Sequence, residues 1–389
     1  MSRKTRERRL AEHRARLRER HREVLLGLYR GKGRDETVHP HDGLAAQPDA
    51  SASEFRVLAY GPDGLDERRL GSVDELEGLV GRWPVVWLNV DGLADVAAVT
   101  RLGHRFGLHP LALQDALTPS QRPKAETYPG HAFVAARMLT LDGDLTSEQL
   151  GLFVGRGFVV TFQEQPGGDP FEPIRRRIRG NLGRIRGSGS DYLAHALLDS
   201  VVDAYFPLLE GYAERMAELE LRVLSRPDRG VMADLHGVRR DLVGLRRAVW
   251  PLRDALGLLM RDDEAVFQPE TRLALRDCQD HAMQVIDLIE SYRELTAALA
   301  EMYLEGSNHR MNEVMKVLTI IATLFMPLSF VASLYGMNFS VDASPWNMPE
   351  LHWRYGYPFA LGLMLAIALA FLWLFKKKGW LRRDDGPQP

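Results

Sequence analysis

Cysteine is almost absent from this sequence of 389 residues, with Cys278 as the single example. One thiol excludes an intramolecular disulfide and a thiolate metal cluster within the chain, and it suits a reducing, cytoplasmic environment. An excess of charge of one sign is lacking as well, since 50 Lys and Arg residues nearly balance 52 Asp and Glu residues. We therefore expect no binding of nucleic acid.

Motifs of catalysis are also lacking. The sequence contains no phosphate-binding loop, no nucleophile elbow and no clustered His–Cys metal motif. We expect no enzymatic activity, and a membrane-anchored enzyme is the competing hypothesis. The Arg-rich N-terminus has no apolar core of the length that a signal peptide needs, so we interpret residues 1–53 as a basic N-terminal extension and linker.

Two kinds of pattern divide the middle of the chain. Residues 54–167 predict an α/β cytoplasmic domain, with a helical stretch at 95–117 and strands at 55–60, 85–92, 132–139 and 157–164. Strand signals then vanish, and helical spacing predicts long helices at 191–224, at 231–259 and from Glu270 onward. The third pattern has no clear stop signal before the following apolar segment. We interpret residues 168–311 as a cytoplasmic helical domain that includes a stalk helix, so the fold class is α+β followed by long helices.

Two uncharged runs, at 317–335 and 358–375, are each long enough to cross a bilayer, which takes about 20 helical residues. Two such runs with a short loop between them argue against a buried core helix. Basic residues flank the pair on its outer sides, so the positive-inside rule places both termini in the cytoplasm. The expected parts are a first transmembrane helix within 312–336, an external loop at 337–356, a second transmembrane helix at 357–376 and a basic cytoplasmic tail at 377–389.

One face of the first span is polar, small or methionine. Steps of three and four residues place on it Asn312, Met315, Thr319, Ala322, Met326, Ser329, Ser333 and Gly336. Close packing of helices in lipid explains small residues on such a face, and a water-filled pore is the alternative. Asn312 and Asn338 favour the pore, because polar groups in membrane spans usually face an interior or a pathway. Two helices per chain cannot enclose a conduit, so a pore requires an oligomer.

The segment NEVMKVLTIIATLFMPLSFVASLYGMNF, at residues 312–339, closely resembles the first membrane helix of the CorA family of magnesium and cobalt transport proteins. The signature of that family corresponds to Gly336, Met337 and Asn338. The resemblance extends over most of the chain from about residue 55, through HPLALQDALTPSQRPKAE (109–126), RDCQDH (276–281), MPEL (348–351), YGYP (355–358) and KKKGW (376–380).

The resemblance implies a funnel-shaped homopentamer in the plasma membrane, with the first membrane helix lining the pore and the second forming an outer ring. It also implies pore-facing roles for Asn312, Met315, Leu318, Met326 and Ser329. Ser329 stands where the family more usually has threonine. Methionine and leucine rings at such positions can gate a pore by excluding water.

The external mouth has its own candidate residues. A ring of Asn338 carboxamides can hydrogen-bond a hydrated Mg²⁺, which sheds its water reluctantly. Gly336 is expected to let the chain turn tightly at the helix end. In the loop, Asp342 and Glu350 are expected to raise the local concentration of cations.

The resemblance also implies regulation, by Mg²⁺ bound between neighbouring cytoplasmic domains. The matching acids are Asp115 and Asp277, and Asp280 and His281 are further candidates. Carboxylates that face each other across a subunit boundary repel, and a divalent cation relieves that repulsion. The family often has Glu where Gln114 stands, so we expect a weaker site here.

The expected function is uptake of Mg²⁺ along an electrochemical gradient, with Co²⁺ and Ni²⁺ as further substrates. One alternative is a Zn²⁺ transporter of the same superfamily, for which His39, His41 and His352 supply softer ligands. The intact Gly-Met-Asn favours magnesium. A second alternative is a membrane sensor or scaffold with a closed bundle that does not conduct.

Overall fold

The computed structural model describes residues 50–119, 121–225, 228–261, 266–337, 347–349 and 353–380. Most of the expected N-terminal extension and of the basic tail lies outside these ranges. Two compact units make up the chain: residues 1–221 with 233–297, and residues 222–232 with 298–389.

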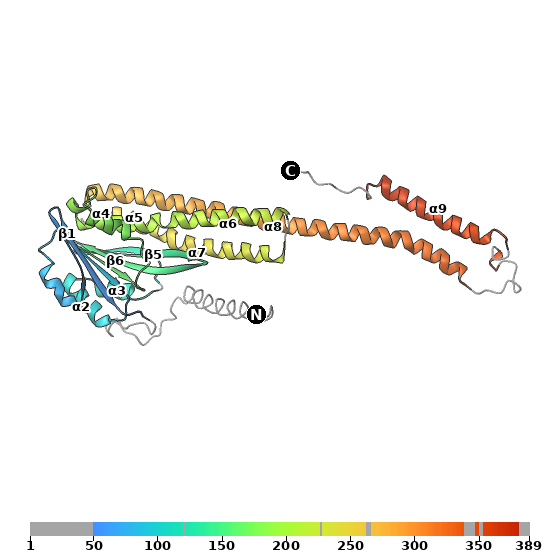
Figure 1. The fold of residues 1–389 in the computed structure, drawn as a ribbon. Coiled ribbons are helices and arrows are strands. Elements are labelled where there is room, and N and C mark those ends of the chain that lie inside the picture. The colour runs from blue at the N-terminus through green and yellow to red at the C-terminus, as the bar shows by residue number, and fades with distance from the viewer. Residues whose placement is uncertain are drawn as a thin grey trace. The chain divides into compact units, whose positions relative to one another are not determined.

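The first unit contains one seven-stranded sheet with the strand order β2-β1-β3-β7-β6-β5-β4 (Figure 1). The central pair, β3 and β7, is parallel, and the other neighbouring pairs are antiparallel. The four predicted strands are confirmed as β1, β3, β5 and β7. The bounds are β1 Glu54–Gly61, β2 Gly64–Leu70, β3 Val85–Asp91, β4 Lys124–Tyr128, β5 His131–Asp142, β6 Asp144–Gly155 and β7 Phe158–Gln163.

Three further strands are polar or begin with polar residues, and the sequence pattern did not predict them. β2 has the sequence GLDERRL and only its last residue is buried, while β4 reads KAETY. β6 begins with the exposed and half-buried residues DLTSE before it enters the core. Each of the three pairs with a neighbour in an antiparallel hairpin, so pairing within the sheet determines their structure more than side-chain preference does.

The first face of the sheet carries the apolar core. Val57, Leu88 and Phe153 belong to one buried cluster with Leu102 and Leu113, which come from the helices packed on that face. Those helices are α2 (Val96–Phe106) and α3 (Pro110–Ala116), next to the 3-10 helix η1 (Val73–Gly78). The single helical stretch predicted at 95–117 is therefore two helices. Gly107 ends α2 with a left-handed φ of 63°, and Pro110 begins α3.

The second face of the sheet is covered by α5 (Ser190–Asp203), which contacts β5, β6 and β7, and it lies next to α4 (Glu172–Arg179) (Figure 1). The short 3-10 helix η2 (Ile185–Gly187) connects α4 to α5. Trp87 points to this face and packs edge-on against Phe171, with ring centroids 6.0 Å apart. Because β-strand side chains alternate, this face receives residues such as Leu58 and Trp87 while the first face receives Val57 and Leu88.

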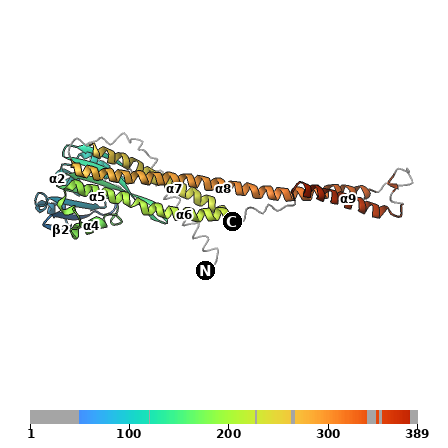
Figure 2. The same cartoon turned by 90° about the horizontal axis from the view of Figure 1, so that it is seen from above.

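Long helices make up the rest of the described chain. They are α6 (Tyr205–Ser225), α7 (Arg229–Met260), α8 (Pro269–Tyr335) and α9 (Gly356–Lys377). The helix predicted at 191–224 is divided at Ala204 into α5 and α6, whereas the prediction of a helix without a stop from Glu270 is confirmed. α8 has 67 residues and continues through Pro327. Figure 2 shows α6, α7 and α8 as long rods.

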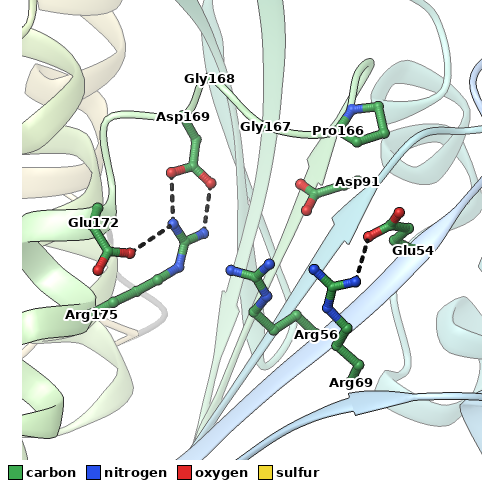
Figure 3. A pocket seen from close by; sticks show the side chains of 10 residues that line it. All are labelled: Glu54, Arg56, Arg69, Asp91, Pro166, Gly167, Gly168, Asp169, Glu172 and Arg175. Atoms are coloured by element: carbon green, nitrogen blue, oxygen red, sulfur yellow. Dashed lines mark hydrogen bonds and ion pairs between the residues drawn. The ribbon is translucent and has the colours of Figure 1, made fainter.

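A polar cavity of about 450 Å³ lies on the second face, where β3 and β7 end (Figure 3). Arg56 and Arg69 are directly opposite each other in the register of β1 and β2, and Arg69 lies 3.6 Å from Glu54. Burial raises the pKa of Asp91, and the charge of Asp169 raises it further. Guanidinium and carboxyl groups line the cavity together, so its charge selects neither a cation nor an anion.

The strongest ion pair in this cavity joins Arg175 to Asp169. The two Arg175 amino groups donate to the two Asp169 oxygens, at 2.8 and 2.6 Å, and both side chains are less than a tenth exposed. Burial alone would raise the pKa of Asp169, but the hydrogen bonds and charge of Arg175 outweigh it and lower that pKa. The Arg175 guanidinium also lies over the Trp87 ring, 5.2 Å from its centroid, so the pair fixes α4 on the sheet.

Asp169→Ala is expected to lower the free energy of unfolding of the cytoplasmic domain by about 3 kcal/mol or more, because it removes the bidentate partner of a buried guanidinium. The matched control is Glu172→Ala, which removes a half-exposed carboxylate 3.9 Å from Arg175 and is expected to cost less than about 1 kcal/mol. Chemical unfolding of the full-length variants, followed by tryptophan fluorescence, measures both. Equal losses in the two variants would contradict the assignment.

Candidate cation sites

Three metal-ligating side chains meet where α5 packs against the beginning of α8. The ligand atoms of Asp199, Asp203 and His281 all lie within 4.8 Å of one another. His281 Nδ1 is 3.9 Å from an oxygen of Asp199 and 3.9 Å from an oxygen of Asp203. Asp199 and Asp203 are four residues apart in α5, so both carboxylates project from one side of that helix.

The electrostatics of this cluster favour a bound cation. Burial is the first cause that raises the pKa of Asp199, and the charge of Asp277 raises it too, against the opposing effect of His281. Burial and the charges of Asp199 and Asp277 likewise raise the pKa of Asp203. Two carboxylates, with the charge of Asp277 nearby, therefore share one imidazole, whose Nδ1 is buried and makes no hydrogen bond. A divalent cation would relieve this repulsion.

The ligand set fits a divalent ion. Carboxylate oxygens suit Mg²⁺, and an imidazole nitrogen extends the set toward Co²⁺ and Ni²⁺. Asp277, a predicted regulatory acid, contributes charge to the cluster, and His281 lies in it. Asp277 and Asp280 are both exposed, and neither is among the three ligands. Asp199 and Asp203 are not among the residues expected from the sequence. The available signal was the spacing of two acids by four residues within a helical pattern.

Asp115 lies in α3, outside this cluster. Its Oδ1 accepts a hydrogen bond from Gln121 Nε2 at 2.9 Å, and its Oδ2 accepts one from Lys124 Nζ at 2.6 Å. Gln149 Nε2 donates to its backbone carbonyl at 2.9 Å. The neighbouring Gln114 is exposed. The predicted pairing of Asp115 with an acid of another subunit stays a prediction.

The predicted pore residues within the described chain share one helix. Asn312, Met315, Leu318, Met326 and Ser329 all lie in α8, and all are exposed in the single chain. Met337 is exposed as well. The remaining predicted residues, Asn338, Asp342 and Glu350, lie outside the described residues.

Gly336 follows the end of α8, but it makes no left-handed turn there. Its N–H donates to the carbonyls of Ala332 and Ser333, at 3.0 and 3.2 Å, as in a continuing helix. A Cβ at this position would meet only those two oxygens, at 3.4 Å, which is ordinary contact. The described chain, which ends here at Met337, therefore shows no left-handed turn at Gly336, and a role for its backbone freedom stays a prediction.

The two apolar helices leave their surfaces uncovered. The most apolar windows of α8 and α9 are each only 6% buried, whereas the core helix of a soluble protein would be mostly buried. α9 carries Lys376 and Lys377 in its last turn, and the Lys377 ammonium lies 5.2 Å from the centroid of the Trp373 ring. Such a basic and aromatic end is typical of a membrane boundary.

Comparison with known proteins agrees with these features. The family model for CorA-like Mg²⁺ transporter proteins matches residues 84–377. The cobalt/magnesium transport protein CorA of Thermotoga maritima is 41% identical over 331 residues, which cover 84% of this chain and 92% of that protein. The cobalt/magnesium transport protein CorA of Methanocaldococcus jannaschii is 27% identical over 84% of this chain and 99% of that protein.

Solved structures show the same fold. The structure of the CorA magnesium transporter from Methanocaldococcus jannaschii matches with a TM-score of 0.71 and 22% identity, over 84% of this chain and 98% of that chain. The cytoplasmic domain of ZntB from Vibrio parahaemolyticus matches with a TM-score of 0.53 and 11% identity, over 67% of this chain and 100% of that chain. From the family match and the identity to its members, this chain belongs to the CorA-like Mg²⁺ transporter family.

Proposed function

We propose that this protein is a channel-like transporter that carries Mg²⁺, and also Co²⁺, across the plasma membrane along an electrochemical gradient. The observation that supports it most is the composition of α8. Near its beginning, this one unbroken helix carries His281 of the candidate cation cluster, with the charge of Asp277 close by. Near its end, it carries the polar stripe and an uncovered apolar surface. The named activity of the relatives supports the same conclusion.

The conducting form is a homopentamer with both termini in the cytoplasm. Two apolar helices per chain cannot surround a pore, and their exposed surfaces need lipid or further copies to cover them. α8 lines the pore and α9 forms the outer ring. Basic residues at the end of α9 and before the first span support a cytoplasmic position for those ends.

Selectivity for magnesium arises at the external mouth. A ring of Asn338 carboxamide oxygens holds hydrated Mg²⁺ without stripping its water, and neutral oxygens bind weakly enough for release. Deeper in α8, Met315, Leu318 and Met326 form apolar constrictions, while Asn312 and Ser329 form polar rings. Met337 and Gly336 position the signature, and Asp342 and Glu350 attract cations to the mouth.

Gating uses the cytoplasmic acids. Intracellular Mg²⁺ held by Asp199, Asp203 and His281 within a subunit, and by Asp115 and Asp277 at the boundary with the next, keeps the pentamer closed. Loss of the ion leaves partly buried carboxylates to repel each other, which shifts the population toward the open state.

A zinc transporter is the second candidate, and the imidazole of His281 in the cluster is the observation that favours it. Flux through the purified protein in liposomes, with Mg²⁺, Co²⁺, Ni²⁺ and Zn²⁺ compared under an inside-negative potential, decides between them. Mg²⁺ entry that rises with the potential supports the proposal. Zn²⁺ entry without Mg²⁺ entry would replace it, and no flux of any ion would support a closed sensor or scaffold.

Asn338→Ala is expected to reduce Mg²⁺ entry to the level of empty liposomes, because the ring of carboxamide oxygens at the mouth is lost. The matched control is Asn347→Ala, the same substitution elsewhere in the same loop, which is expected to keep wild-type flux. Size-exclusion chromatography checks that both variants assemble as the wild type does. Wild-type flux through Asn338→Ala would refute its role.

Asp199→Asn combined with Asp203→Asn is expected to raise the Mg²⁺ concentration for half-maximal protection from protease about tenfold or more, since both carboxylate ligands of the cluster are removed. Asp280→Asn is the control, because it neutralises an exposed acid of α8 that lies outside the ligand set. An unchanged midpoint in the double variant would exclude the cluster as the regulatory site.

A further inference from the structure

The carboxylate of Asp115 forms an ion pair with a lysine side chain. Lys124 Nζ lies 2.6 Å from Asp115 Oδ2 and 2.6 Å from Glu126 Oε1, so one ammonium bridges two carboxylates. The outer oxygens of the pair are also engaged, since Gln121 donates to Asp115 Oδ1 and the Tyr128 hydroxyl donates to Glu126 Oε2. The ammonium thus stands where a cation bound by Asp115 would make its contact.

A lysine is unusual in this part of the sequence. Lys124 is the one lysine between residues 33 and 315, an interval in which every other permanently charged basic residue is arginine. Arginine is a planar fork that fits one carboxylate with two parallel hydrogen bonds, as Arg175 does with Asp169. Lysine is a compact, strongly hydrated point charge on a flexible stem, which resembles a metal cation and releases its partner more readily.

The bridge is stable but open to exchange. Burial lowers the pKa of Lys124, yet the hydrogen bonds and charges of Asp115 and Glu126 outweigh it and raise that pKa, so the ammonium is charged at neutral pH. The side chains of Lys124, Asp115 and Glu126 are 30%, 23% and 36% exposed. Solvent can therefore reach the pair, and the ammonium can leave Asp115 while it remains bound to Glu126.

We propose that Lys124 is a tethered counter-cation that competes with divalent cations for Asp115 and sets the Mg²⁺ concentration at which the regulatory site fills. This inference rests on the proposed regulatory role of Asp115. Without Mg²⁺, the ammonium neutralises Asp115 and reduces its repulsion of other acids. When Mg²⁺ binds, Lys124 gives up one of its two ion pairs and Glu126 retains it, so displacement costs less than the loss of the whole bridge.

The test is a Mg²⁺ titration of the full-length protein in lipid nanodiscs, followed by protection from protease. Lys124→Met keeps the length of the side chain without its charge, and is expected to lower the half-maximal Mg²⁺ concentration about three- to tenfold. Lys124→Arg keeps the charge, and its midpoint is expected at or above that of the wild type. Lys124→Gln, which can still donate a hydrogen bond, provides a second neutral variant if Lys124→Met does not fold.

Competition for Asp115 is separated from a general charge effect by a double-mutant cycle. In an Asp115→Asn background, Lys124→Met is expected to cause no further shift of the midpoint. A midpoint that stays constant or rises in Lys124→Met, with an unchanged thermal unfolding temperature, would show that Lys124 holds the site in place and would overturn the inference. Wild-type protein without any protection by Mg²⁺ would instead refute the proposed regulation, and the inference with it.

Discussion

Partly buried carboxylates need a positive partner, and this chain gives its acids three different ones. Asp169 has the guanidinium of Arg175, held by two hydrogen bonds away from solvent, and that pair fixes α4 on the sheet. Asp115 has the ammonium of Lys124, which is bound but reachable by water. Asp199 and Asp203 share the imidazole of His281 as their nearest basic group, with Asp277 adding a further negative charge. The negative charge is neutralised most completely at Asp169, less at Asp115 and least at Asp199 and Asp203, where a metal ion could supply the missing positive charge.

This order matches the roles proposed for the three places. A pair that holds the fold together benefits from rigid, bidentate geometry, since loss of either partner leaves a buried charge. A site that senses a cation must both bind and release it. The metal-free site therefore has to be stable enough to exist while its negative charge remains only partly neutralised. The raised pKa values of Asp199 and Asp203 express that residual cost in the metal-free chain. In the proposed competition, Lys124 reduces the same cost at Asp115, which would make that acid the weaker ligand for Mg²⁺.

The sequence predicts those helices and strands whose own residues carry a clear hydrophobic pattern. The central strands β3 and β7 are apolar because both faces are buried, and α8 is helical over its whole length because its periodicity never stops. The hairpin strands β2 and β4 escaped prediction, since only pairing with a neighbour makes their polar residues extended. For the site, resemblance pointed to Asp115, Asp277 and His281. The packing of α5 on α8 was needed to add Asp199 and Asp203, and folding of β4 beside α3 was needed to place Lys124 on Asp115.

A hydrogen bond within α8 shows how one residue of its polar stripe can interact with a hydrated cation. The Thr319 hydroxyl donates a hydrogen bond to the backbone carbonyl of Met315, at 2.7 Å, within its own helix. Its oxygen then faces outward with lone pairs and no hydrogen to give. A hydrated Mg²⁺ presents the hydrogens of its water shell to the surroundings, so the lining of the proposed pore has to accept hydrogen bonds rather than donate them. A threonine bonded in this way meets that requirement as the Asn338 carboxamide oxygen does, and it does so without a negative charge that would hold the ion in place.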